Sequence, residues 1–175
     1  EKEFPPLELD SGRILEPIGE ETDSSIRYRV VFAKIGPARF YGHNDLNNTI
    51  QRSLRRAAVE VRFSMGFHPK MLISYLPALP LGMEGQEELF EFQSYYDMDE
   101  NELVRLLNRF SPDGLDFLSA SKLTASEESL SECVDHFVYS VDLEDGDIKK
   151  VLKTLSTAGS ENWRPELEGR IETYL

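Results

Sequence analysis

The sequence predicts an α+β protein in which an antiparallel sheet carries two helices on one face. The main observation is the order of patterns between residues 26 and 123. Apolar residues recur there at every second position in four segments, and at the spacing of a helix in two others. A second observation is a further strand, helix and strand pattern between residues 124 and 175.

The first strand is predicted to begin at Arg27, where "RYRVVFAKIG" alternates between inward and outward positions until Gly36-Pro37 ends it. The first helix is predicted over residues 43–58. One side of this helix carries an apolar stripe, formed by Leu46, Ile50, Leu54 and Ala57. The opposite side carries three arginines, Arg52, Arg55 and Arg56.

The remaining elements follow the same logic. The second strand, "KMLISYLPA", and the third, "EELFEFQSYY", are separated by a turn that contains "LPLG". The second helix begins after Asp99, which is placed to cap it, and "SPDG" ends it before the fourth strand, "LDFLSASKL". This order is the split βαβ arrangement of a ferredoxin-like domain, which we place at residues 26–123.

Two segments flank this domain. Residues 1–25 are acidic and contain adjacent prolines, so we expect a linker or tail from a preceding domain. Residues 124–175 are predicted to form an additional C-terminal βαβ-like unit from "HFVYSVDL", "GDIKKVLKTLSTAG" and "ELEGRIETYL". This unit either extends the sheet or begins an incomplete second copy, and we expect more sequence to follow its apolar end.

Charge is distributed unevenly along the chain. The formal net charge is −13, but residues 27–70 contain nine Lys and Arg residues and only two acidic residues, Asp45 and Glu60. A partner responds to the local potential within a screening length of about 10 Å rather than to the net charge. The basic stretch therefore either attracts an anionic partner or pairs with acidic elements of its own fold.

Composition also limits cofactors and location. The single cysteine, Cys133, cannot hold an iron–sulfur cluster, which needs about four thiolates. The sequence has no run of about 20 apolar residues, and its first residues lack the layout of a signal peptide. We therefore expect a cytoplasmic protein with no membrane partner.

Several separated motifs resemble one family. In order along the chain they are "FAKIGPARFYGHNDL", "LRRAAVEVRFSMGFHPK", "LPLG" and "LNRFSPDGL". Together they resemble the radical-SAM-linked domain family, whose members are fused behind a radical S-adenosylmethionine protein or encoded beside one. The match places the family's histidine and aspartate at His43 and Asp45, its arginine pair at Arg55 and Arg56, and its G-F-x-P loop at residues 66–69. Gly42 stands where the family has serine, and His68 where it often has asparagine.

The resemblance implies an accessory role. S-adenosylmethionine and the [4Fe-4S] cluster are then expected on the partner radical SAM protein or domain, in cis or in trans, with no cofactor in this chain. Genes for members of this family are commonly found with RNA-processing and ribosome-related genes, and this association favours RNA as the ligand. The resemblance therefore implies a substrate-binding domain without catalytic activity of its own.

The candidate binding residues follow from these patterns. A flat guanidinium fork suits phosphate, and an aromatic ring in a glycine-containing loop can stack on a base. The residues expected to bind a phosphorylated ligand are Arg39, Arg52, Arg55, Arg56, Phe67 and Lys70. No metal site is predicted.

Two other functions stay open. If His43, Asp45 and His68 converge, they would form an acid–base set, and the chain would be an enzyme in its own right. Alternatively, the basic face docks on the radical SAM partner and the chain is a protein-interaction module. A purely structural interpretation is that Asp45 caps the helix and His43 packs beside the sheet.

Overall fold

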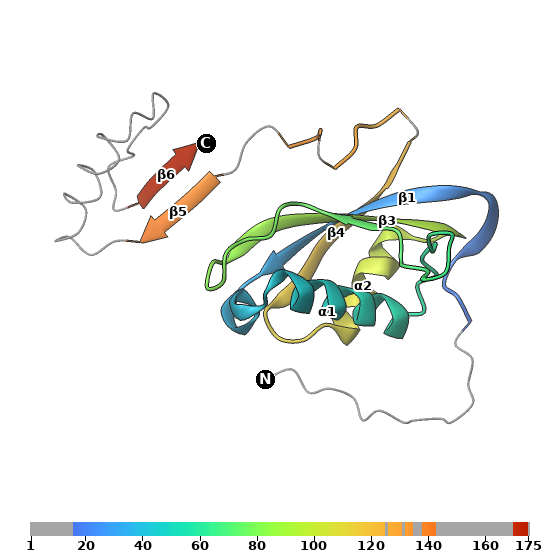
Figure 1. Cartoon of the computed structure of the whole chain (residues 1–175), viewed down its shortest axis with the longest axis horizontal. Coiled ribbons are helices and arrows are strands. Elements are labelled where there is room, and N and C mark those ends of the chain that lie inside the picture. The colour runs from blue at the N-terminus through green and yellow to red at the C-terminus, as the bar shows by residue number, and fades with distance from the viewer. Residues whose placement is uncertain (1–15, 125, 131, 135–137, 143–169, 175) are drawn as a thin grey trace. The chain divides into compact units, whose positions relative to one another are not determined.

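The computed structural model describes residues 16–124, 126–130, 132–134, 138–142 and 170–174 (Figure 1). The chain divides into two compact units, Glu1–Leu130 and Ser131–Leu175. No helix in the described ranges is long and apolar enough to cross a membrane.

The first unit is built on a four-stranded sheet. Its strands, in chain order, are β1 (Glu20–Lys34), β2 (Ile73–Tyr75), β3 (Gly85–Asp97) and β4 (Leu115–Leu123). The spatial order is β2-β3-β1-β4 and all neighbours are antiparallel. Phe92 of β3 marks the register, because it lies opposite both Tyr28 of β1 and Ile73 of β2. This order confirms the predicted ferredoxin-like α+β arrangement.

Two helices cover one face of the sheet (Figure 1). They are α1 (His43–Arg56) and α2 (Glu100–Phe110), and the short 3-10 helix η1 (Gly36–Phe40) leads from β1 into α1. Burying the apolar stripe of each helix against the aromatic side chains of the sheet removes it from water and holds the layers together. The central members of this core include Tyr28, Phe32, Ile50, Leu54, Phe90, Phe92, Leu103 and Leu107.

The strands differ from the sequence prediction at two ends. β1 begins at Glu20, well before the alternating pattern that starts at Arg27. The added part pairs through its backbone, Glu20 with Asp97 and Glu21 with Tyr96, and a register shift separates it from Ile26. Backbone pairing needs no alternation of side chains, which is why the pattern gives no sign of it. β2 is shorter than the predicted second strand because only Ile73–Tyr75 pairs continuously with β3.

The second unit contains two described strands, β5 (Val138–Asp142) and β6 (Arg170–Tyr174). They pair antiparallel, with Ser140 opposite Glu172. In a βαβ unit the two strands run parallel, so this direct antiparallel pairing differs from the predicted βαβ-like extension. The helix predicted between the strands, like most of the predicted N-terminal tail, lies outside the described residues.

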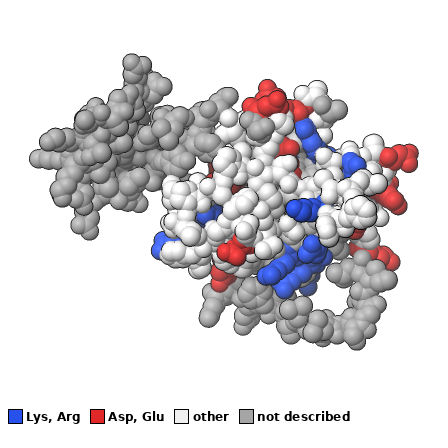
Figure 2. Space-filling model, viewed as in Figure 1, with Lys and Arg blue, Asp and Glu red and all other residues white. Residues whose placement is uncertain are grey.

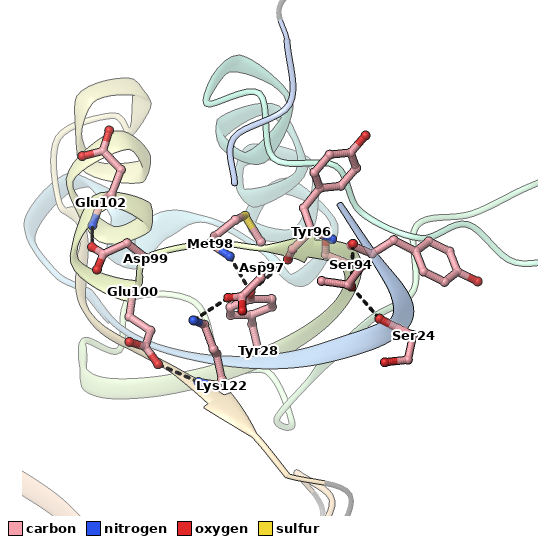
Figure 3. A network of polar contacts seen from close by, with 12 residues as sticks. Ser24, Tyr28, Ser94, Tyr96, Asp97, Met98, Asp99, Glu100, Glu102 and Lys122 are labelled. Carbon is pink, nitrogen blue, oxygen red and sulfur yellow. Dashed lines mark hydrogen bonds and ion pairs between the residues drawn. The ribbon is translucent and has the colours of Figure 1, made fainter. Parts of the chain in front are cut away.

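A polar network joins β1, β3 and β4 at the start of α2 (Figure 3). The ammonium group of Lys122 contacts Asp97 Oδ1 at 2.5 Å, and the backbone N–H of Lys122 donates to Glu100 Oε1 at 3.3 Å. Asp99 caps α2 as predicted, accepting a hydrogen bond from the Glu102 N–H at 2.8 Å. These contacts fix the position at which the chain leaves β3 and enters the helix.

The segment that follows β4 is held by two arginines of β1. The Arg27 guanidinium donates to the carbonyl of Glu127 at 2.6 Å, and the Arg29 guanidinium to that of Glu128 at 2.9 Å. Leu130, at the end of this segment, is buried. Part of the basic charge of the 27–70 stretch thus serves the fold itself.

Candidate functional site

Three of the predicted binding residues, Arg52, Arg55 and Arg56, lie on one face of α1, which we call the arginine face. All three side chains are exposed. Within the described residues no ion pair joins any of them to a carboxylate. Figure 2 shows basic side chains gathered over the C-terminal half of α1. Arg55 and Arg56 also lie in the last helical turn, where positive charge offsets the helix dipole.

Other basic residues of the same stretch are used within the fold. Arg29 forms an ion pair with Glu91 at 2.7 Å, and Arg62 donates to Gln93 Oε1 at 2.8 Å. Arg39, predicted to bind phosphate, lies 3.5 Å from Glu84 and stacks over the ring of Phe40. Some basic residues of the 27–70 stretch therefore pair within the fold, whereas the arginine face of α1 has no carboxylate partner among the described residues.

The loop of residues 64–70 projects from the domain between two paired positions, Phe63 and Met71. Its neck is closed by the Ser64 N–H, which donates to the Lys70 carbonyl at 2.8 Å, and by the Lys70 N–H, which donates to Ser64 Oγ at 3.0 Å. Both large apolar side chains at the tip, Met65 and Phe67, are fully exposed. His68 and Lys70 are exposed as well.

The loop and His43 lie at different ends of α1. His43 is the first residue of the helix, whereas the loop follows its last residue and lies near that end (Figure 1). Fourteen helical residues span about 21 Å. The structure therefore does not bring His68 beside His43 and Asp45. Among the described residues, no three His, Cys, Asp or Glu side chains are grouped so that they could hold a metal ion.

His43 and Asp45 occupy the first turn of α1. Gly42 is the N-cap and provides no side-chain cap, and Asp45 adds negative charge to the first turn, where it interacts favourably with the helix dipole. The ring nitrogen Nε2 of His43 lies 3.1 Å from Asn47 Nδ2, and its ring meets the ring of Tyr75 edge-on at 6.2 Å. His43 thus links the start of α1 to β2.

A hollow lies beside His43, between the start of α1, the end of β1 and the segment that joins β2 to β3. Its cavity volume is about 20 Å³, which is room for about one water molecule. The lining residues are Phe32, Lys34, Tyr41, His43, Leu46, Asn47, Tyr75, Leu76, Ala78, Leu79, Glu88 and Leu89. The lining is mostly apolar, with a few polar groups among it.

Two of the residues that line the hollow, Lys34 and Glu88, are oppositely charged. Lys34 is only 2% exposed, and this burial lowers the pKa of its ammonium group. Burial raises the pKa of the Glu88 carboxyl, while the nearby Lys34 charge acts in the opposite direction. Shifts in pKa caused by burial occur both in functional sites and in structural charge pairs.

Two buried polar atoms of the residues that line the hollow, Asn47 Oδ1 and Tyr75 Oη, have no hydrogen-bond partner among the described residues. An unpaired buried polar group costs about 1–3 kcal/mol, so it normally has a partner in the working protein. Apart from His43, the residues that line the hollow were not predicted from the sequence, although two of them continue a pattern of buried residues. In β1 every second residue is buried, Tyr28, Val30 and Phe32, and Lys34 is the next position of that series. In β3 Glu88 stands two residues before the buried Phe90 and four before the buried Phe92.

Comparison with known protein families shows one that matches this chain. A model described as "Uncharacterized protein conserved in bacteria (DUF2344)" matches residues 27–171. Neither the curated proteins nor the solved structures contain a match. The family match covers β1 from Arg27 onward, the other three strands of the sheet, α1, the 64–70 loop and the hollow, and extends into the second unit. The chain therefore belongs to the DUF2344 family of uncharacterized proteins conserved in bacteria.

Proposed function

We propose that this protein is an accessory domain that binds a phosphate-bearing ligand, RNA, for a radical SAM enzyme. The observation that carries the proposal is the arginine face of α1. Arg52, Arg55 and Arg56 are exposed and have no carboxylate partner in the described part of the chain, whereas Arg29 and Arg39 are paired. Guanidinium groups bind phosphate oxygens in a flat fork, so such a face suits a phosphate backbone.

The 64–70 loop supports a single-stranded ligand. Phe67 is fully exposed at its tip, where stacking on a base would remove apolar surface from water. Lys70 at the neck of the loop adds an exposed cation. A stacking ring next to basic side chains is the combination by which proteins hold single strands without reading sequence.

The radical SAM part of the proposal rests on the sequence motifs. A [4Fe-4S] cluster needs about four thiolates and this chain has one cysteine, so the cluster and S-adenosylmethionine belong on the partner. The separation of His43 from His68 along α1 gives an acid–base enzyme no geometric support. In the proposed division of work, this domain holds the ligand and the partner performs the chemistry.

The test is a titration of the full chain with single-stranded RNA across salt concentrations. Four phosphate contacts predict a slope of log affinity against log salt of about −3, and Arg55→Ala with Arg56→Ala should reduce it by about half. Arg105→Ala with Arg109→Ala removes the same charge from α2 and should leave the slope unchanged. Phe67→Ala should weaken binding at every salt concentration without changing the slope, because stacking involves no counterion release.

Two outcomes would overturn the proposal. One is absence of RNA binding at low salt. The other is an equal loss of slope in the α1 and α2 double variants, which would mean that net charge rather than the arginine face is responsible. Binding of the radical SAM protein that is abolished by the α1 variants would instead identify the face as a protein-docking surface.

A further inference from the structure

We infer that two side chains of α2, Asn108 and Glu100, close the outer edge of β4 and so prevent the sheet from pairing with a second copy of this chain. In the described sheet, ordered β2-β3-β1-β4, the only neighbour of β4 is β1. The free N–H and C=O groups of such an edge strand can pair with a strand of another molecule. This role concerns the β4 edge alone and is independent of the proposed RNA binding.

Asn108 occupies the place beside Phe117 that a pairing strand would take. Its side-chain N–H donates to the Phe117 carbonyl at 2.7 Å, and its side-chain oxygen accepts a hydrogen bond from the Phe117 N–H at 2.8 Å. In an antiparallel strand the N–H and C=O of one residue point to the same side, and successive residues alternate between the two sides. Because β1 fills one side of β4, the Asn108 amide lies on the other. One side chain thus makes both hydrogen bonds that a pairing strand would make with Phe117.

Glu100 closes a second position of the same edge. The Lys122 N–H donates to Glu100 Oε1 at 3.3 Å, so this N–H also points away from β1. The Lys122 ammonium group contacts Asp97 at 2.5 Å, which holds a charged side chain near the end of the strand. Charged residues and a covering helix are both ways in which proteins protect the edges of their sheets. The two closed positions lie toward opposite ends of β4, with Ala120 between them.

The opposite edge of the sheet has less need of such protection. β2 has three residues, whereas β4 has nine. Pro77 stands two residues after Tyr75 and has no N–H, so strand pairing cannot continue there. Short edge strands and prolines both hinder pairing between sheets. β4 is long and contains no proline, so the side chains of α2 supply the protection that its own sequence lacks.

The test is the mass of the full chain in solution, measured by light scattering over a range of protein concentrations. The wild type should be a monomer throughout. Asn108→Ala with Glu100→Ala frees the N–H and C=O of Phe117 and the N–H of Lys122, so the apparent mass should rise toward twice the monomer value as the concentration increases. Amide hydrogen exchange locates the contact, because the Phe117 N–H should exchange rapidly in the monomeric variant and slowly in the dimer.

Two further variants separate edge pairing from loss of stability. Tyr28→Phe also deprives one N–H and one carbonyl of their partner, but in the core, so it should remain a monomer. Ala120 lies two residues before Lys122 and therefore directs its N–H to the same outer side. Ala120→Pro, added to the double variant, removes that N–H and should restore the monomer. Circular dichroism verifies that each variant is folded.

A double variant that stays monomeric while its Phe117 N–H exchanges rapidly would overturn the inference, because the two side chains would then serve only to hold α2 on β4. A dimer that persists after Ala120→Pro would also overturn it, since the contact would lie elsewhere. The same holds for a wild-type dimer that Ala120→Pro dissociates, since the edge would then be open. If the double variant does not fold, Asn108→Ala alone carries the test, because it frees both backbone groups of Phe117.

Discussion

The hydroxyl group of Tyr28 accepts a hydrogen bond from the backbone N–H of Met98 at 2.8 Å and so ties β1 to the start of α2 (Figure 3). The same hydroxyl donates to the carbonyl of Tyr96 at 2.9 Å. Tyr28 is fully buried, and its ring stacks on Phe92. The hydroxyl therefore satisfies one backbone N–H and one backbone carbonyl at the point where β3 ends.

Tyr28→Phe should lower the free energy of unfolding by about 1–3 kcal/mol, because a buried N–H and a carbonyl both lose their partner. Urea denaturation monitored by circular dichroism measures the difference. Tyr75→Phe is the matched control, since it removes a buried hydroxyl that has no hydrogen-bond partner in the part of the chain that the structure describes. It should leave stability unchanged or raise it. Equal destabilisation by the two substitutions would show that the Tyr28 hydrogen bonds contribute nothing.

The fold of the first unit could be predicted because its signals are local. "LDFLSASKL" corresponds to β4 (Leu115–Leu123), and α2 begins after the Asp99 cap, as its side-chain chemistry predicts. The early start of β1 at Glu20 could not be predicted, because "EETDSS" has no alternation and its pairing partners, Asp97 and Tyr96, lie far away in the sequence.

Of the two candidate sites, one could be predicted from local sequence and the other could not. The arginine face of α1 follows directly from helical spacing. The hollow does not, because Lys34, Tyr75 and Glu88 come from three different strands and meet only through the sheet order. His43 is the one candidate from the sequence that lines it. A charged residue that continues a buried alternation is the local signal to look for.

Glu88 should make the stability of the protein depend on pH. Burial raises its pKa in the folded state, so the folded protein binds a proton more readily than the unfolded chain. Stability then decreases as the pH rises from the unfolded pKa through the folded pKa. Glu88→Gln should therefore match the wild type in acid, where the carboxyl is protonated in both states, and be more stable than the wild type at neutral pH.

The measurement is the free energy of unfolding from pH 3 to 8. Glu87→Gln, at an exposed neighbour on β3, is the control for loss of one negative charge. Lys34→Met removes the cation that lowers the Glu88 pKa, so this pKa should rise further in an NMR titration of the Glu88 carboxyl carbon. A Glu88→Gln effect that is independent of pH would contradict the assignment of the burial penalty to the charged carboxylate.

The two helix starts should respond in opposite directions to substitution. Asp99→Ala removes the hydrogen bond from the Glu102 N–H and should cost about 1 kcal/mol. Gly42→Ser adds a cap to α1, which has none, and should gain a few tenths of a kcal/mol. A Cβ atom at Gly42 meets only Asp45 Oδ2, at 3.6 Å, so the serine fits. Thermal denaturation of both variants checks the signs, and a loss of stability in Gly42→Ser would show that the glycine is required there.

Gly114 should be the least replaceable glycine of the turns. Its φ of +82° lies in the left-handed region, and an added Cβ would collide with the carbonyl oxygen of Ile35. The Ile35 N–H also donates to the Gly114 carbonyl at 2.8 Å, so a shift of this turn would break the contact between the end of β1 and the start of β4. Gly82 has a similar φ of +86° but open space around its Cβ position, which makes it the matched control.

Gly82→Ala should cost about 1–2 kcal/mol, from the strain of a left-handed backbone alone. Gly114→Ala should cost clearly more, because the collision adds to the same strain and the backbone cannot move without losing the Ile35 hydrogen bond. Urea denaturation of the two variants gives the comparison. Equal losses would mean that the turn moves away from Ile35 at no cost, and that φ alone selects glycine at both positions.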